Sequence, residues 1–353
     1  MKDTKRKYNY DLLRILACIM VIAIHVSAKN FYKIPLESFD WKILNIFDSI
    51  SRASVPLFFM ISGAFFLNKK IDYKTLYKKY ILKYLILYII YSIIYGIIEW
   101  YKLDTIHLLT FNNIKIIIKN SIIGSNHLWF LITLITLYAI SPFMKKALDN
   151  LESKDWKNIL IIAFIFILLN SIYKLDVIPY YKWIKIILDK IPLSIICQYY
   201  IYFILGYYFM NIDKKENNKT LIYLATFIIN VILCIVITKN ISIIKNHATP
   251  VAYDYLFILT YIEAICLFKI FNNKQIISVS NKHKKIIKYI SDQTLNIYLI
   301  HMIFVNFIFD KQINVLNYGA IIYVPLLILI IFLLSLLTSI VLNKIKRVVF
   351  NKA

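Results

Sequence analysis

The sequence has few of the residues that soluble binding sites usually need. Only five Gly and seven Pro occur among 353 residues, too few for a Gly-rich phosphate loop or a Pro-rich linker. The four cysteines lie far apart without a C-x-x-C spacing, which argues against a zinc site and a disulfide framework. Charged residues make up 17% of the chain, whereas a typical soluble domain has roughly a quarter.

Long apolar runs dominate what is present. Hydrophobic residues make up 60% of the chain, and the mean hydropathy is +0.66. Runs of about 20 apolar residues match the thickness of a bilayer and are too long for barrel strands. They predict an all-α, polytopic membrane protein without a soluble domain, as one domain over 1–353. We expect ten spans, which begin near Tyr10, Ser54, Lys79, His127, Asn158, Pro192, Thr220, Ala252, Ile290 and Tyr318.

Two further segments, 112–123 and 178–190, are amphipathic and are expected to lie at the membrane surface.

The positive charge is distributed in a way that predicts the topology. The net charge is +23, and alternate hydrophilic segments, starting with the N-terminus, hold most of the 42 Lys and Arg residues. Basic loops stay on the cytoplasmic side and face anionic lipids. We therefore expect both termini in the cytoplasm, a location in the cytoplasmic (inner) membrane, and no nucleic-acid partner.

The first predicted helix carries three ionisable residues: Asp11, Arg14 and His25. A charged group inside a span costs about 2.5–3.5 kcal/mol on insertion scales, so each needs a reason. Eleven positions separate Arg14 from His25, which places them on one helix face about 16 Å apart along the axis. Asp11 is three residues from Arg14 and is placed to pair with it. Because a cleavable leader has no use for these residues, we expect the segment to be retained.

This spacing suits a long ligand with an anionic end at Arg14 and a reactive end at His25, and acetyl-CoA has that shape. A neutral imidazole can remove a proton from an attacking hydroxyl or accept the acyl group itself. The alternative is that Asp11 and Arg14 extend to the membrane surface, while His25 only bonds a neighbouring helix.

Five segments in order resemble the membrane-bound acyltransferase family 3. They are DLLRILACIMVIAIH (11–25), RASVPLFFMISGAFFL (52–67), HLWFLITLITLYAISP (127–142), YFILGYYF (202–209) and SDQTLNIYLIH (291–301). The resemblance implies a ten-helix core that transfers acyl groups, usually acetyl from acetyl-CoA, to hydroxyls of extracytoplasmic glycans or lipid-linked sugars. It places the family's Arg and catalytic His at Arg14 and His25.

The third predicted helix departs from some relatives. Where they have a paired-Arg motif, this chain has Lys78, Lys79 and Lys83. A Lys neutralises phosphate but lacks the two-pronged grip of Arg. We keep these lysines as donor-binding candidates.

Further candidates for supporting the reaction or binding the acceptor are Arg52, Ser62 and Trp129. Arg52, at the predicted outer side, is placed to orient a sugar or its phosphate. Ser62 and Gly63 are better explained by close helix packing. Trp129 can stack on a sugar ring, although a Trp at a helix end is equally often an interfacial anchor.

The last candidates are His127, Glu99 and His301. His127 begins the fourth helix near the expected acceptor. Glu99 is placed to orient His25 or the acceptor, but such a group more often contacts water. His301 lies inside the ninth helix, where a polar tie between helices is as reasonable as a direct role.

Together these features predict a membrane O-acyltransferase, most simply an O-acetyltransferase. Its partners would be acyl-CoA as co-substrate, a surface glycan or lipid-linked sugar, and the bilayer, without a metal or permanently bound cofactor. The alternative is a transporter or flippase for a glycan precursor or small solute, a class in which ionisable residues inside spans are also common. Acceptor identity, donor chain length and oligomeric state stay open.

Overall fold

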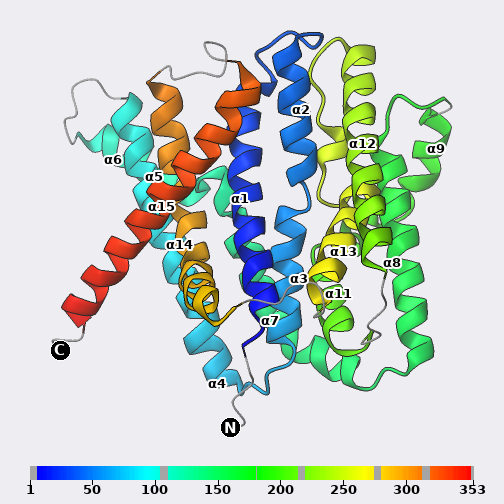
Figure 1. Ribbon diagram of the computed structural model, residues 1–353, viewed down its shortest axis with the longest axis horizontal. Coiled ribbons are helices and arrows are strands. Elements are labelled where there is room, and N and C mark those ends of the chain that lie inside the picture. Colours follow the sequence, from blue (N-terminus) through cyan, green and yellow to red (C-terminus); the bar gives the residue numbers. More distant parts are fainter. Residues whose placement is uncertain are drawn as a thin grey trace. The chain divides into compact units, whose positions relative to one another are not determined.

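A computed structural model describes residues 6–103, 110–179, 181–213, 219–273, 280–311 and 319–350 (Figure 1). In these ranges the chain is helical and contains no strand. Its contacts divide it into two compact units, one of residues 1–64 with 153–353 and one of residues 65–152. The all-helical membrane fold expected from the sequence is therefore confirmed.

The first unit holds most of the helices. They are α1 (Tyr8–Phe31), α2 (Phe39–Ser51), α3 (Ser54–Phe66, whose last two residues fall in the second unit), α8 (Ser153–Lys174), α9 (Tyr181–Leu188), α10 (Leu193–Ile196), α11 (Tyr200–Asn211), α12 (Thr220–Lys245), α13 (Ile258–Asn272), α14 (Asn281–Asp310) and α15 (Ala320–Phe350). A short 3₁₀ turn, Val251–Tyr253, precedes α13.

The second unit contains α4 (Tyr73–Thr75), α5 (Leu82–Leu103), α6 (Phe111–Ile123) and α7 (Trp129–Asp149). A π-helical segment, Leu76–Ile81, joins α4 to α5, and a 3₁₀ turn, Asn126–Leu128, leads into α7. The amphipathic segments 112–123 and 178–190 form the helices α6 and α9; their location at a membrane surface stays a prediction.

Eight helical segments of the described chain are long and apolar enough to cross a membrane. They are Tyr8–Phe31, Phe39–Phe66, Tyr73–Lys102, Asn126–Asp149, Ser153–Lys174, Thr220–Lys245, Val251–Asn272 and Ala320–Ile345. The helix α3 begins at Ser54, as predicted, but the candidate span extends farther, because α2 continues it back to Phe39 across a turn at residues 52–53. The polar residues of α2 interrupt its apolar pattern, yet several of them are buried inside the first unit.

The remaining two predicted spans correspond to α11 and α14. The helix α11 runs in the same direction as α13, since Tyr202 bonds the carbonyl of Tyr255 at one end and Phe209 accepts from Asn272 at the other. The helix α14 runs in the same direction as α1 (see below). In a chain of ten spans, α11 and α13 are the sixth and eighth, and α1 and α14 are the first and ninth. Because successive spans alternate in direction, the two helices of each pair should be parallel, as they are. These directions agree with about ten spans.

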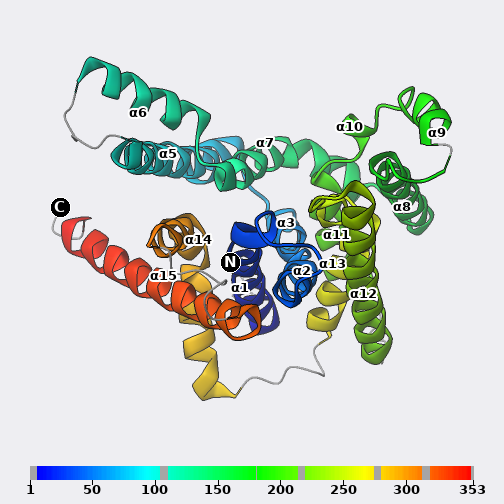
Figure 2. The ribbon, with the colours of Figure 1, turned by 90° about the horizontal axis from the view of Figure 1, so that it is seen from above.

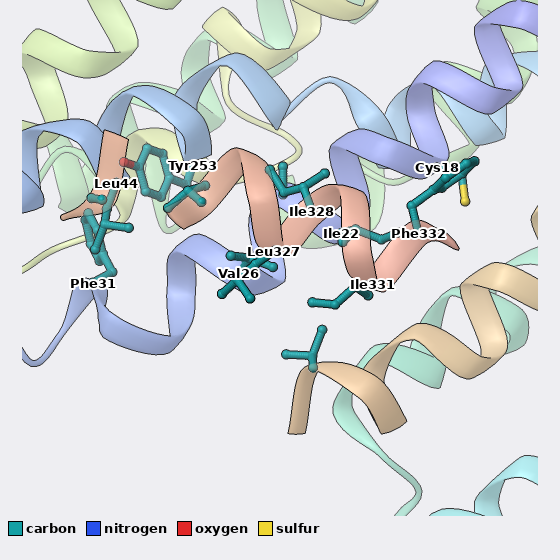
Figure 3. Close-up of a cluster of buried hydrophobic side chains, with 14 of the residues drawn as sticks. Cys18, Ile22, Val26, Phe31, Leu44, Tyr253, Leu327, Ile328, Ile331 and Phe332 are labelled. Carbon is teal, nitrogen blue, oxygen red and sulfur yellow. The ribbon is translucent and has the colours of Figure 1, made fainter. Parts of the chain in front are cut away.

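The helix α1 lies at the centre of the first unit (Figure 2). In its most apolar window 61% is buried, against 28% for α15 and 22% for α12. Figure 3 shows the core that holds it: the α1 residues Cys18, Ile22 and Val26 lie against α15 residues Leu327, Ile328, Ile331 and Phe332. Burial of such side chains stabilises a membrane protein mainly through close packing.

The helices α3 and α11 pack through two glycines. A Cβ on Gly63 would overlap the backbone of Phe203, and a Cβ on Gly206 would overlap the backbone of Met60. Small residues that allow backbones to approach are typical of helix pairs in membranes. This confirms the packing interpretation of the Ser62–Gly63 segment, with Gly63 as the contact and Ser62 half-buried beside it.

Candidate active site

One face of α1 lies along α14 over several turns. From the N-terminal end of α1, Arg14 donates to Ser291 (3.3 Å), Cys18 contacts the carbonyl of Thr294 (3.8 Å), and Lys29 donates to Asn306 (2.7 Å). The partners in these pairs differ by 277, 276 and 277 positions, so the two helices run in parallel with one register.

The predicted ionisable pair lies on this face. His25 is beside His301 of α14, with ring centroids 5.2 Å apart. Arg14 and His25 therefore both point toward α14, as their eleven-residue spacing predicted, and neither points away from the bundle. The side chain of Arg14 is 30% exposed and His25 is half-buried, whereas His301 is fully buried.

The N-terminal end of this face is an ion-pair network around Asp11. Its carboxylate accepts two hydrogen bonds from Arg6 (2.6 and 3.0 Å) and one from Ser291 (2.8 Å). Arg14 lies farther from it, at 3.5 Å, so the predicted pairing of Asp11 with Arg14 exists but is the longer one. Arg6 also pairs with Asp292 (2.7 Å). Asp11 therefore helps to hold Arg14 in place but does not occupy all the hydrogen-bond donors of its guanidinium group.

A second charged cluster lies near His25. Arg52, at the turn between α2 and α3, forms a buried ion pair with Asp48 one helical turn earlier. Its guanidinium also lies over the ring of Tyr253, 4.1 Å from the centroid, and donates to the carbonyl of Tyr253 (3.3 Å). Arg52 and Lys29 are close enough to His25 to act on it electrostatically. Arg52, which was predicted to lie at the outer side of the membrane, is therefore buried inside the first unit and paired with Asp48.

Tyr253 is fixed by a hydrogen-bond network with α2. Its hydroxyl donates to the side-chain oxygen of Asn45 (2.5 Å), which also accepts from Ser49 (3.2 Å). The amide of Asn45 donates to the carbonyl of Ile235 in α12 (3.1 Å). Buried polar groups of this kind are satisfied by one another and define a unique arrangement. The network holds the turn before α13 against α2, and with it the surroundings of Arg52.

Sequence reasoning missed two buried acids, Asp48, which pairs with Arg52, and Glu263 of α13. The side chain of Glu263 is fully buried, and within the described residues both of its carboxylate oxygens lack a hydrogen-bond partner. Arg52 is close enough to act on it electrostatically. The signal was available, because Glu263 stands inside a predicted span where an acid is as costly as the residues of the first helix.

The lysine candidates belong to the second unit. Lys78 and Lys79 lie in the π-helical segment and Lys83 at the start of α5, and all three are exposed. Single π-helical turns are rare and often mark functional positions. The segment that holds Lys78 and Lys79 therefore has an unusual backbone.

The other candidates of the second unit differ in their surroundings. His127 is buried, bonds Ser125 (2.9 Å) and packs edge-on against Tyr95 (centroids 4.7 Å apart). Trp129 begins α7 and is half-buried, and Glu99 near the end of α5 is exposed.

Comparison with known families bears directly on this arrangement. The family model described as the acyltransferase domain Acyl_transf_3 matches residues 7–343, nearly the whole chain. The chain belongs to acyltransferase family 3. Comparison with curated proteins and with solved structures finds no match. As a family 3 protein the chain is a membrane acyltransferase that transfers groups other than aminoacyl groups, and the paired residues of α1 and α14 lie inside the matched range.

Proposed function

We propose that this family 3 acyltransferase is an O-acetyltransferase of the cytoplasmic membrane, with both termini in the cytoplasm. It would move acetyl from cytoplasmic acetyl-CoA to a hydroxyl of an extracytoplasmic polysaccharide or lipid-linked sugar. The observation that carries the proposal is the common face of Arg14 and His25. Both contact α14, and His25 follows Arg14 by eleven positions, which correspond to about 16 Å along the helix axis.

Arg14 is the donor-binding residue of this scheme. Its side chain is partly exposed, and its nearest acid, Asp11, is more closely bound by Arg6. A guanidinium grips phosphate oxygens with two parallel hydrogen bonds, so Arg14 suits the phosphates of CoA. Lys78, Lys79 and Lys83 are exposed cations that would add to phosphate binding.

His25 is the catalytic base of the scheme. The unprotonated ring nitrogen removes the proton of the acceptor hydroxyl while the hydroxyl oxygen attacks the thioester carbonyl carbon. The tetrahedral intermediate then breaks its C–S bond, and His25 returns the proton to the departing sulfur. The products are the acetyl ester and free CoA, so the step needs no other reactant.

Arg52 would support the negative charge that develops during transfer. Its Nε–H is buried and finds no hydrogen-bond acceptor among the described residues, although its other nitrogens bond Asp48 and Tyr253. A buried donor without an acceptor costs free energy in the resting protein and becomes useful when a new acceptor forms. The oxyanion of the tetrahedral intermediate is such an acceptor.

The test is mass spectrometry of surface glycans from cells with the gene, without it, and with the gene restored as wild type or as His25→Ala. We expect acetyl esters only with the wild-type gene, at equal amounts of protein in the membrane. A flippase would change the amount of glycan at the surface and leave its ester content per sugar unaltered. Equal ester content in all four strains would end the proposal.

A further inference from the structure

We propose that Lys29 and Tyr32 form the acceptor subsite of this protein and that the acceptor is a negatively charged glycan. Lys29 binds a phosphate or carboxylate group of the glycan, and the ring of Tyr32 lies against one of its sugars. This inference rests on the proposed function, because it assigns the second substrate of the same reaction to residues beyond His25.

The face of α1 that carries His25 continues toward the C-terminal end of the helix. Lys29 follows His25 by four positions and Tyr32 by seven, so at about 100° per residue the three lie within roughly 60° of one another around the helix. Tyr32, which caps α1, keeps helical backbone angles, so the same spacing applies to it. The contacts agree, because His25 lies against His301 and Lys29 donates to Asn306 (2.7 Å), both residues of α14.

This end of the face is where an acceptor has to arrive. In the proposed scheme the donor phosphates are at Arg14, so the donor reaches His25 from the N-terminal side and leaves the other side open. With the N-terminus in the cytoplasm, as proposed, that other side is the extracytoplasmic one. Lys29 and Tyr32 follow His25 by roughly 6 and 10 Å along the helix axis. An acceptor held there can present a hydroxyl to His25.

Electrostatic interactions place both residues in the neighbourhood of His25. Lys29 and Arg52 are each close enough to His25 to act on it electrostatically. Arg52 is also close enough to act on Tyr32. His25, Lys29 and Tyr32 therefore belong to one cluster at this end of α1, as their spacing along the helix indicates.

The two side chains offer complementary contacts to an acidic sugar. The ammonium group of Lys29 has three hydrogen-bond donors, and the amide oxygen of Asn306 orients it without neutralising its charge. Such a group binds phosphate or carboxylate as a point charge. Tyr32 is 61% exposed and combines an apolar ring face with a hydroxyl, which suits the apolar face and the hydroxyls of a sugar ring. The pair therefore favours an anionic glycan over a neutral one.

Each residue also has a structural role that an experiment must separate from acceptor binding. Lys29 lies in the last turn of α1, where a cation stabilises the helix. A Tyr at a helix end anchors the helix at the membrane surface. Neither role depends on the charge or the concentration of the acceptor, so kinetics with varied acceptor distinguish binding from structure.

The experiment measures acetyl transfer from radiolabelled acetyl-CoA by the purified protein in lipid nanodiscs. Two acceptor preparations come from cells without the gene, namely the surface polysaccharide and the lipid-linked sugar fraction. Each is used as isolated and after chemical reduction of its carboxyl groups to alcohols. The variants are Lys29→Gln, Lys29→Arg and Tyr32→Leu. Lys42→Gln is the matched control, because Lys42 is exposed in α2 and the substitution removes the same charge.

We expect Lys29→Gln to raise the KM for the acceptor roughly tenfold or more and to leave the KM for acetyl-CoA unchanged, since it removes a charged hydrogen bond. Lys29→Arg keeps the charge and should stay close to wild type, as should Lys42→Gln. Tyr32→Leu should raise the acceptor KM several-fold. With these increases observed, a loss of transfer on carboxyl reduction assigns the anion to a sugar carboxylate, and retained transfer assigns it to a phosphate.

An equal acceptor KM in Lys29→Gln and Lys42→Gln would overturn the proposal. Label in a glycan that has neither phosphate nor carboxyl groups would overturn it as well. Thermal unfolding of each variant is recorded in parallel, and a loss of transfer that only follows the folded fraction would also count against acceptor binding. Failure of the proposed function looks different, because the wild-type protein would then label neither preparation.

Discussion

The guanidinium of Arg14 and the imidazole of His25 lie on the same side of α1, because Arg14 bonds Ser291 and His25 packs against His301, both on α14. The parallel helix α14 therefore contacts α1 at both ends of the proposed donor site. The arrangement assigns each residue a separate task, binding for Arg14 and proton transfer for His25, and the two tasks can be separated by experiment.

Removing the imidazole should abolish transfer without removing the protein. We expect His25→Ala to lower kcat by a factor of roughly 10²–10⁴, the usual contribution of a general base. His247→Ala is the matched control, because His247 is exposed in the turn after α12 and should leave the rate unchanged. The measurement is ester formation per amount of membrane-embedded protein. Near-normal ester formation by His25→Ala would contradict the assignment of the base.

The first helix could be predicted from sequence because its signals are local. Charged groups inside an apolar run are costly, and a spacing of eleven residues fixes a common face whatever surrounds the helix. The start of the second span could not be found in the same way. Asp40 and Lys42 lower the hydropathy of α2, and Asn45 and Asp48 are tolerated only because Tyr253 and Arg52 bond them.

The partner of His25 was equally hidden. His301 was a candidate from the motif IYLIH, but its position opposite His25 depends on the register between two helices 276 residues apart in the chain. The sequence pattern of neither segment indicates which residues of the two helices lie opposite each other. The burial of Glu263 inside the first unit is tertiary information too, although its cost inside a span is visible in the sequence.

The buried ion pair of Asp48 and Arg52 should be important for stability. Arg52→Ala leaves a buried carboxylate without its partner, which costs about 3–5 kcal/mol of unfolding free energy. The double variant Asp48→Asn with Arg52→Gln should regain much of that loss, because it removes both charges together. Thermal or denaturant unfolding in detergent measures both.

The exposed pair of Lys145 and Asp149 in α7 is the control, with the same spacing along a helix and a distance of 2.9 Å. Its removal through Asp149→Asn should change stability by less than about 1 kcal/mol. A loss at Asp149 as large as the loss at Arg52 would show that burial is not the cause.

The glycine contact between α3 and α11 makes a sharper packing prediction. Gly63→Ala pushes a methyl group into the backbone of Phe203, so the helices must separate, at a cost of about 1–3 kcal/mol or more. Ser62→Ala, one position earlier, is the control and should be nearly neutral. Unfolding temperatures of the purified variants decide the matter, and equal temperatures for both would refute the close contact.

Binding of acetyl-CoA to purified protein tests the central claim most directly. Equilibrium binding of radiolabelled acetyl-CoA would be compared for wild type, Arg14→Ala, Arg14→Lys and His25→Ala. We expect His25→Ala to bind as the wild type does and Arg14→Ala to bind about tenfold to a hundredfold more weakly, since a charged hydrogen bond is worth about 1.5–3 kcal/mol. Arg14→Lys should fall between them. If Arg14→Ala bound acetyl-CoA with wild-type affinity, Arg14 would not hold the donor and the account would be contradicted.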